Sequence, residues 1–349
     1  MKDGGGQLPA PLARSETETK RVLEGLRAKL QAHLGPWHDR IFGDHTTFVL
    51  TGSGGRGEMT DGSDIDGYVV RVRGDVDDEH DRKLEDALKA AVLELGLPPL
   101  DRDGEFVKMK TADALIDNMG SKKDDATDAF TARMLFLVES RPLTGEAAYE
   151  ELFHRVSNAY RQPARAHGAD FLPFYLVNDI VRYWRTVLLN HEDRLREKRL
   201  ELSGRGLSEA DLEAMLLANR RYRGQKLRFP RCLSCFSTLA YLLALAPSDH
   251  DSISIAQERE MFRLRPIDRL HHVAILQPRS RPRIERLLEV YAEYLERTND
   301  SKVRILERLR TNEPFQREAS RASVQFTEEM FHLIQDLGNG NRLHRHMLI

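Results

Sequence analysis

Two apolar stretches joined by a glycine-rich turn occupy residues 46–72, where the sequence reads TTFVLTGSGGRGEMTDGSDIDGYVVRV. Residues 46–52 and 64–72 have the β-branched and aromatic composition of strands, and we predict that they form two strands of one sheet. Side chains along a strand alternate between its faces, so Asp64 and Asp66 should point to the same side. Two neighbouring carboxylates repel each other unless a cation lies between them.

The residues of this turn suit a phosphorylated ligand. Mg²⁺ and similar hard cations bind carboxylate oxygens together with substrate phosphates, and Asp64 and Asp66 would supply two such carboxylates. Gly52 and Ser53 would add backbone N–H groups and a hydroxyl that favour a phosphate tail. The pattern therefore predicts a site for transferring a nucleotide, with Mg²⁺ or Mn²⁺ as the metal and an NTP as the substrate. A simple turn is the structural alternative, since glycine-rich and Ser-Asp-x-Asp segments are common in turns.

These residues resemble the nucleotidyltransferase superfamily that includes DNA polymerase beta. Its signature is Gly-Ser, a short spacer and Asp-x-Asp at the start of the next strand, which Gly52-Ser53 and Asp64-x-Asp66 match. The longer pattern Gly-Ser-x-Gly-Arg-x-Glu before Ser-Asp-Ile-Asp is similar to the protein uridylyltransferases of nitrogen signalling and their nucleotidyltransferase relatives. Residues 137–145, which read LVESRPLTG, resemble the segment that closes the catalytic domain in that group. The resemblance covers roughly residues 20–155.

The resemblance implies an enzyme that moves NMP from an NTP to an acceptor and releases pyrophosphate. It favours a protein acceptor, which would be uridylylated or adenylylated, and an RNA 3′ end is the other macromolecular acceptor. It also implies a third carboxylate on a nearby strand, which we expect over residues 105–110. Glu105 is the first candidate, with Asp103 and Asp101 as alternatives, so that Asp64, Asp66 and Glu105 would be the metal ligands and catalytic residues.

Other residues of the turn are candidates for nucleotide binding. The positions in the turn that we assign to the triphosphate are Gly52, Ser53, Gly54, Arg56 and Gly57. Arg56 would neutralise phosphate charge, and the alternative is an ordinary surface arginine. Glu58 is expected to have a structural role, in which it pairs with Arg56 or caps the next turn.

A second basic region covers residues 219–231, which contain six basic residues and no acidic one. Local positive charge attracts a nucleotide or a polyanionic acceptor. Lys226 and Arg228 are therefore candidates for nucleotide or acceptor contact, together with Arg182 on a preceding helix. The alternative interpretation of the region is a solvated turn between two helices.

The pattern of the whole chain predicts an α+β protein, with a small mixed-sheet nucleotidyltransferase domain followed by an all-helical C-terminal domain. We expect a disordered tail at 1–14, the catalytic domain at 15–160, a helical substrate- or acceptor-binding domain at 165–337, and a tail at 338–349. Ser15 would cap the first helix. Apolar residues at helical spacing predict helices over 16–35, 78–96, 170–195, 208–220, 230–246, 266–276, 281–297, 300–312 and 325–337.

Composition limits the remaining classes of function. The 349 residues include 53 basic and 55 acidic ones, so the net charge of −2 gives no general attraction to nucleic acid. Two cysteines exclude a disulfide scaffold and suit a reducing compartment. No apolar run reaches the ~20 residues that span a bilayer, and the first fifteen residues lack the apolar segment of a secretion signal. We therefore expect a cytoplasmic protein of a bacterium or archaeon, without a membrane partner.

Two alternative functions stay open at this stage. Nucleotidylation of a small molecule such as an aminoglycoside would need an acidic pocket, which the basic region at 219–231 disfavours. A non-catalytic nucleotide-binding module, with a regulatory or antitoxin-like role, would keep the turn without the transfer. The hydrolase and ligand-sensing domains of the signalling enzymes have no counterpart here, so we expect neither reversal of the reaction nor glutamine sensing. The base of the NTP, the acceptor and the oligomeric state cannot be predicted from the sequence.

Overall fold

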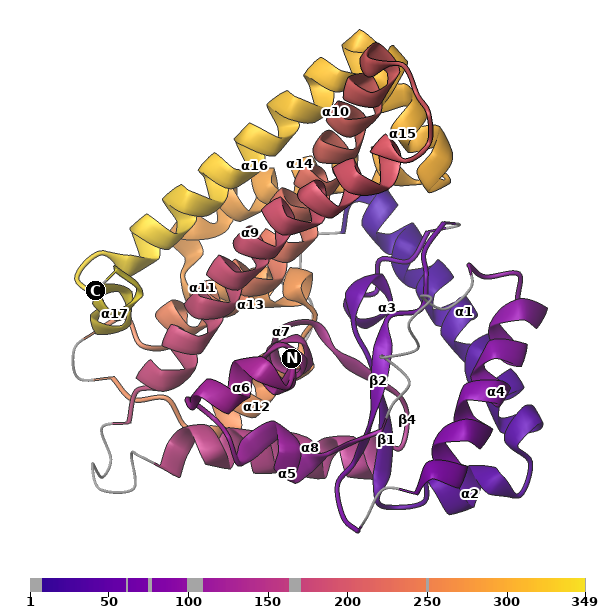
Figure 1. Cartoon of the computed structure of the whole chain (residues 1–349). Helices are drawn as coiled ribbons and strands as arrows, with labels where there is room; N and C mark the ends of the chain where they lie inside the picture. Colours follow the sequence, from indigo (N-terminus) through magenta and orange to yellow (C-terminus); the bar gives the residue numbers. More distant parts are fainter. Residues whose placement is uncertain are drawn as a thin grey trace. The chain divides into compact units, whose positions relative to one another are not determined.

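Helices and one small sheet make up the protein, and the chain divides into two units (Figure 1). The sheet unit comprises Leu12–Pro173 and Ser254–Arg265, and the helical unit comprises Met1–Pro11, Phe174–Ile253 and Pro266–Ile349. The computed structural model describes residues 8–60, 62–74, 77–98, 109–162, 171–248 and 251–348. A mostly helical chain with a small mixed sheet confirms the α+β class. The segment Ser254–Arg265 returns to the sheet unit, which the sequence did not predict.

The sheet has four strands in the order β3-β2-β1-β4. Their bounds are β1 Thr46–Leu50, β2 Gly67–Arg71, β3 Lys110–Thr111 and β4 Arg141–Thr144. Strand β1 pairs antiparallel with β2 and β4, whereas β2 and β3 are parallel. Strand β4 was not predicted, because four residues that include Pro142 are too few to show an alternating pattern. The predicted strand over 105–110 falls largely outside the described residues, and β3 begins at its last residue.

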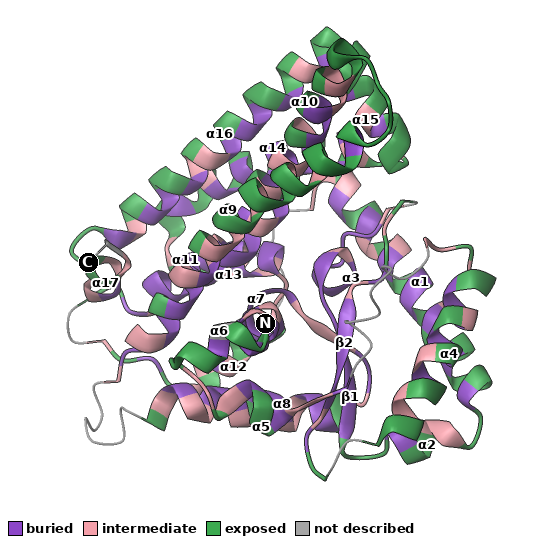
Figure 2. Ribbon diagram, in the orientation of Figure 1, coloured by how far each residue is buried: buried purple, intermediate pink, exposed green. Residues whose placement is uncertain are grey.

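Helices cover both faces of this sheet, which explains why β1 is buried along its whole length. Phe48 and Leu50 belong to one core cluster with residues of α1 (Ala10–Leu34) and α4 (Asp78–Glu94). On the other face, the Tyr68 hydroxyl donates a 2.6 Å hydrogen bond to the Ala132 carbonyl of α7 (Ala129–Glu139). Figure 2 shows the buried strands between the buried sides of these helices.

The other helices of the sheet unit are α2 Trp37–Ile41, α3 Gly52–Arg56, α5 Ala112–Ile116, α6 Lys122–Ala126, α8 Glu146–Arg161 and α12 Ile255–Arg263. Helix α12 packs on α8, where the guanidinium groups of Arg259 and Arg263 pair with Glu150. This pairing fastens a segment that is distant in the sequence to the rest of the unit.

The predicted tail at 1–14 is wrong in its last residues, because α1 begins at Ala10. Pro11 favours the first turn of a helix, and Leu12 is buried, so the helix gains packing by starting earlier than the predicted cap. Ser15 consequently lies inside α1 and not at its N-cap.

The helical unit consists of α9 Phe174–Ser203, α10 Glu209–Lys226, η2 Leu227–Arg231, α11 Cys232–Leu245, α13 Pro266–Leu276, η3 Pro278–Ser280, α14 Arg281–Thr298, α15 Lys302–Thr311, α16 Glu313–Gly338 and α17 Arg342–Leu348. The predicted helices at 266–276 and 281–297 correspond to α13 and α14. Helix α11 is buried nearly all round and forms the centre of this unit. None of the described helices has the length and hydropathy required to cross a bilayer.

The predicted tail at 338–349 is also wrong, because residues 342–348 form α17. Helix α16 does end at Gly338, as the Gly-Asn-Gly sequence indicated. Beyond it, the Asn341 side chain donates hydrogen bonds to the carbonyls of Leu243 (3.2 Å) and Ala246 (2.7 Å), and Leu343 is fully buried. The buried side chains of Asn341 and Leu343 therefore hold α17 in place, although its sequence shows no clear helical spacing of apolar residues.

Both cysteines are buried in α11. Burial raises the pKa of the Cys232 thiol to about 12, so this side chain stays protonated and unreactive near neutral pH. Cys232 and Cys235 are therefore core residues.

Candidate active site

The two predicted aspartates lie just before β2, and Asp66 lies beside the end of β1. The Thr51 N–H donates a 2.9 Å hydrogen bond to the Asp66 carbonyl, which extends the β1–β2 pairing beyond Leu50. Asp64 is exposed, Ile65 is buried in the core, and Asp66 is partly exposed. Burial therefore alternates over these three residues, as it would on a strand with one face in the core. That both carboxylates point to one side stays a prediction.

Gly52 brings the two halves of the sequence pattern into contact. A Cβ atom at Gly52 would lie 2.3 Å from Asp66 Oδ2, and the backbone φ of +59° is one that side chains disfavour. Only glycine therefore lets the Asp66 carboxylate lie directly against the backbone where α3 begins. The Gly-Ser pair and the second aspartate, fourteen positions apart in the sequence, form one local structure.

The glycine-rich turn is more regular than expected. Residues 52–56 form the single turn of α3, which ends at Gly57 in the left-handed conformation with φ +78°. The Glu58 N–H donates to the Ser53 carbonyl at 2.9 Å and closes the turn. The Ser53 side chain is partly exposed, on the first turn, where the N–H groups of a helix have no partner within the helix.

A buried charge cluster of Arg56, Glu58 and Glu139 lies against this turn. Arg56 Nη1 donates to Glu139 Oε2 at 3.0 Å, and Arg56 Nε donates to Glu58 Oε2 at 2.7 Å. The Gly52 N–H donates to Glu139 Oε1 at 3.3 Å. The predicted Arg56–Glu58 pair is thus confirmed, and the interpretation of Arg56 as a surface arginine is wrong, because its side chain is only 8% exposed. A role of Arg56 in neutralising phosphate charge stays a prediction.

Glu139 is the residue that sequence reasoning missed, although it lies in the segment of the second resemblance. That segment packs directly on the turn, since a Cβ at Gly55 would lie 2.0 Å from the Glu139 carbonyl oxygen. Arg141 Nε also donates to the Gly55 carbonyl at 2.9 Å. The sequence did contain a signal for Glu139, which directly follows an apolar run at the end of α7. A glutamate in such a position is buried only when it has hydrogen-bonding or charged partners.

The packing at Gly52 leads to a prediction about two neighbouring glycines. We expect Gly52→Ala to destabilise the protein by at least ~1–2 kcal/mol, the cost of the left-handed backbone for a residue with a side chain, with the clash against Asp66 added. Gly54→Ala is the matched control, because a Cβ there meets only ordinary contacts at 3.9 Å. Denaturant unfolding measures both variants. Equal losses of stability would contradict the close approach of Asp66 to residue 52.

The donors present fit a hard divalent cation. Asp64 and Asp66 offer carboxylate oxygens, which Mg²⁺ and Mn²⁺ prefer. The three candidates for the next ligand, Glu105, Asp103 and Asp101, lie outside the described residues. Within the described ranges no group of three His, Cys, Asp or Glu side chains is placed to hold a metal ion. The metal therefore stays a prediction that depends on the two aspartates.

The candidates beyond residue 170 belong to the helical unit. Arg182 Nη1 donates to Asp179 Oδ1 at 3.2 Å, and Lys226 Nζ lies 5.1 Å from the centre of the Tyr222 ring. Arg228 is exposed on η2. The region 219–231 is helical throughout, so its interpretation as a solvated turn is wrong. Contact of these three residues with a nucleotide stays a prediction.

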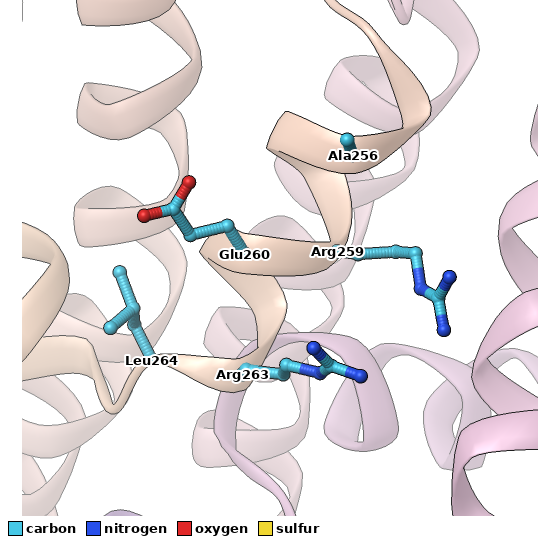
Figure 3. A pocket seen from close by; sticks show the side chains of 5 residues that line it. All are labelled: Ala256, Arg259, Glu260, Arg263 and Leu264. Carbon is cyan, nitrogen blue, oxygen red and sulfur yellow. The ribbon is translucent and has the colours of Figure 1, made fainter.

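A cavity of about 330 Å³ lies along α12, with Ala256, Glu260 and Leu264 in its lining (Figure 3). Its two arginines, Arg259 and Arg263, have Glu150 as a carboxylate partner, and none of the predicted site residues lines it. We assign this cavity no ligand.

Comparison with known proteins adds no relative from which a function could be transferred. No model of a protein family matches the chain, and no curated protein matches it. The case for a function therefore depends on the geometry of the residues described above.

Proposed function

We propose that the sheet unit is a metal-dependent nucleotidyltransferase, which moves NMP from an NTP to an acceptor hydroxyl and releases pyrophosphate. The observation that supports this most directly is the contact between the Asp66 carboxylate and Gly52, with the exposed Asp64 two residues before Asp66. Nucleotidyl transfer needs oxygen ligands for a cation and a binding site for the phosphates. Residues 52–66 would supply both.

In the proposed reaction the acceptor oxygen forms a bond to the α-phosphorus, and the bond from that phosphorus to the bridging oxygen breaks. Asp64 and Asp66 would hold Mg²⁺, which neutralises charge on the phosphates when it is bound. The Ser53 hydroxyl and the backbone N–H groups of Ser53 and Gly54 would hold the triphosphate. The proton of the acceptor hydroxyl would pass to a carboxylate base, for which Glu105 is the first candidate.

The charge cluster beside α3 would act on this reaction by positioning the turn. Glu139 binds both the Gly52 N–H and Arg56, so it connects the start and the end of α3. A turn that is fixed in this way keeps the phosphate-binding groups and Asp66 at a constant separation. Such support by buried neighbours is what makes a site precise.

The acceptor that the resemblance favours is a protein, and one experiment separates it from the alternatives. The purified protein is incubated with each NTP, labelled at the α-phosphate, in Mg²⁺ with and without cell lysate. We expect label on a protein band. The label should be lost completely in excess chelator, because the two aspartates and the phosphates are all negatively charged and repel one another without a cation. Label on RNA or on a small molecule would show that the acceptor is not a protein. Binding without transfer would favour a non-catalytic module, and full turnover in chelator would contradict the metal requirement.

A further inference from the structure

A polar cavity within the helical unit is lined by residues of α10, η2, α15 and α16. Figure 1 shows the neighbouring helices α10, α15 and α16. We call it the α10 cavity. Its volume is about 350 Å³, within the range of roughly 300–1,000 Å³ that is typical of small-molecule sites. All the residues that line it belong to the helical unit, so its description does not depend on the sheet unit.

Positive charge dominates the lining of the α10 cavity. Arg221, Arg228 and Arg317 contribute three guanidinium groups, and Glu313, which pairs with Arg317, contributes one carboxylate. Arg221 is held in place, because its Nη1 donates to the Leu309 carbonyl at 3.2 Å. Guanidinium groups bind phosphate oxygens through paired hydrogen bonds, so this lining favours a phosphorylated ligand.

Arginines of α10 and η2 also act on the neighbouring helix α9. Burial lowers the pKa of His191 on α9, Glu192 opposes this effect, and the charges of Arg223, Arg220 and Arg228 lower the pKa further. A ligand with at least one negative charge would be attracted by these arginines.

Gln225 lines the same cavity and is 95% buried, since only 5% of its surface is exposed. Its Oε1 atom has no hydrogen-bond donor within the described part of the chain. A buried acceptor without a donor is rare in folded proteins and is commonly satisfied by a ligand or a water. The ligand that suits this cavity therefore carries an O–H or N–H group as well as an anionic one.

Gly224 shows that the space beside α10 is open. It lies inside a helix, where glycine is less favourable than alanine, and a Cβ atom there would meet no atom within 4 Å. A larger side chain at this position would therefore begin in open space, at a residue that lines the cavity. Gly224 thus leaves room for a ligand, although glycine lowers the stability of the helix.

We infer that the α10 cavity binds a small phosphate ester that carries a hydroxyl or amino donor, of the size of a nucleoside monophosphate or a sugar phosphate. The arginines would bind the phosphate group, and Gln225 would accept a hydrogen bond from the donor. This site is additional to the proposed transfer site, and it does not require that the protein transfers nucleotides.

The test uses the full chain with Asp64→Asn and Asp66→Asn, so that binding at the proposed transfer site is weakened. Calorimetry is performed with AMP, UMP and ribose 5-phosphate, and with inorganic phosphate and adenosine as partial ligands. We expect at least one ester to bind more tightly than either partial ligand. Gly224→Leu should weaken that binding by roughly tenfold or more, because the new side chain fills the cavity, and Arg228→Ala by about 10–100-fold, the range for a hydrogen bond to a charged group.

Ala210→Leu is the matched control, since residue 210 is exposed on α10 and does not line the cavity. It should leave the affinity unchanged, and the melting temperature of Gly224→Leu should not fall. Three results would overturn the inference: no ester binds, Gly224→Leu binds as tightly as its parent, or single-stranded RNA binds while the monophosphates do not. Absence of transfer by the unsubstituted protein, with ester binding intact, would contradict the proposed function alone.

Discussion

Replacing Asp64 and Asp66 together by asparagine is expected to lower the rate of NMP transfer by about 1,000-fold or more while the protein stays folded. The double change removes two negative charges from the site but nearly conserves side-chain volume. Metal ions contribute several kcal/mol to the stabilisation of charge in a transition state, and ~4 kcal/mol corresponds to a thousandfold in rate. Stability should stay the same or rise, because the repulsion between the two carboxylates is removed.

Transfer of α-phosphate label and the melting temperature are measured for the same protein samples. The control is Glu24→Gln with Asp86→Asn, which removes two exposed carboxylates from α1 and α4 and changes the net charge equally. That control should retain full activity. A large fall in the melting temperature of the double asparagine variant would show that the two aspartates support the fold and are not ligands. An equal loss of activity in the control would assign the effect to net charge.

Removal of the Arg133 side chain is expected to have the largest effect on stability, about 3–5 kcal/mol, because it breaks a buried ion pair and leaves the Asp124 carboxylate without this guanidinium. Arg133 and Asp124 are both fully buried, and Nη1 and Nη2 of Arg133 donate to the two oxygens of Asp124 at 2.9 and 2.7 Å. Arg133 Nε also donates to the Tyr160 hydroxyl at 3.0 Å. Burial alone would lower the pKa of Arg133, but these partners raise it above its usual value, so Arg133 stays protonated.

The measurement is denaturant unfolding of Arg133→Ala beside Lys89→Ala. Lys89 pairs with Glu85 on the exposed side of α4, and its removal should leave the unfolding curve unchanged. The double variant Arg133→Met with Asp124→Leu should recover part of the loss, since it leaves no single buried charge. A double variant that is less stable than Arg133→Ala would contradict the assignment of the cost to the Asp124 carboxylate that has lost its guanidinium.

Local patterns predicted the parts of the fold that depend on neighbours in the sequence. The β1–turn–β2 segment and helices such as α13 follow from alternation and helical spacing, which are properties of short segments. The Arg56–Glu58 pair was within reach for the same reason, because the two residues are only two positions apart.

Contacts between distant segments were not predictable in this way. Strand β4 is short and follows the apolar run of α7, and its role became visible only through its pairing with β1. Helices α12 and α17 depend on contacts of Glu150 with Arg263 and of Asn341 with the carbonyls of Leu243 and Ala246. Each of these partners lies about a hundred positions away, beyond the range of any periodic pattern.

Strand periodicity and turn composition are local, so they were enough to predict two acids after a glycine turn between paired strands. The folded chain was needed to show why residue 52 is glycine, that Glu139 holds the turn, and that Gln225 and three arginines line one cavity. The physical reason is that close approach, burial and charge pairing arise between segments that meet only when the chain has folded.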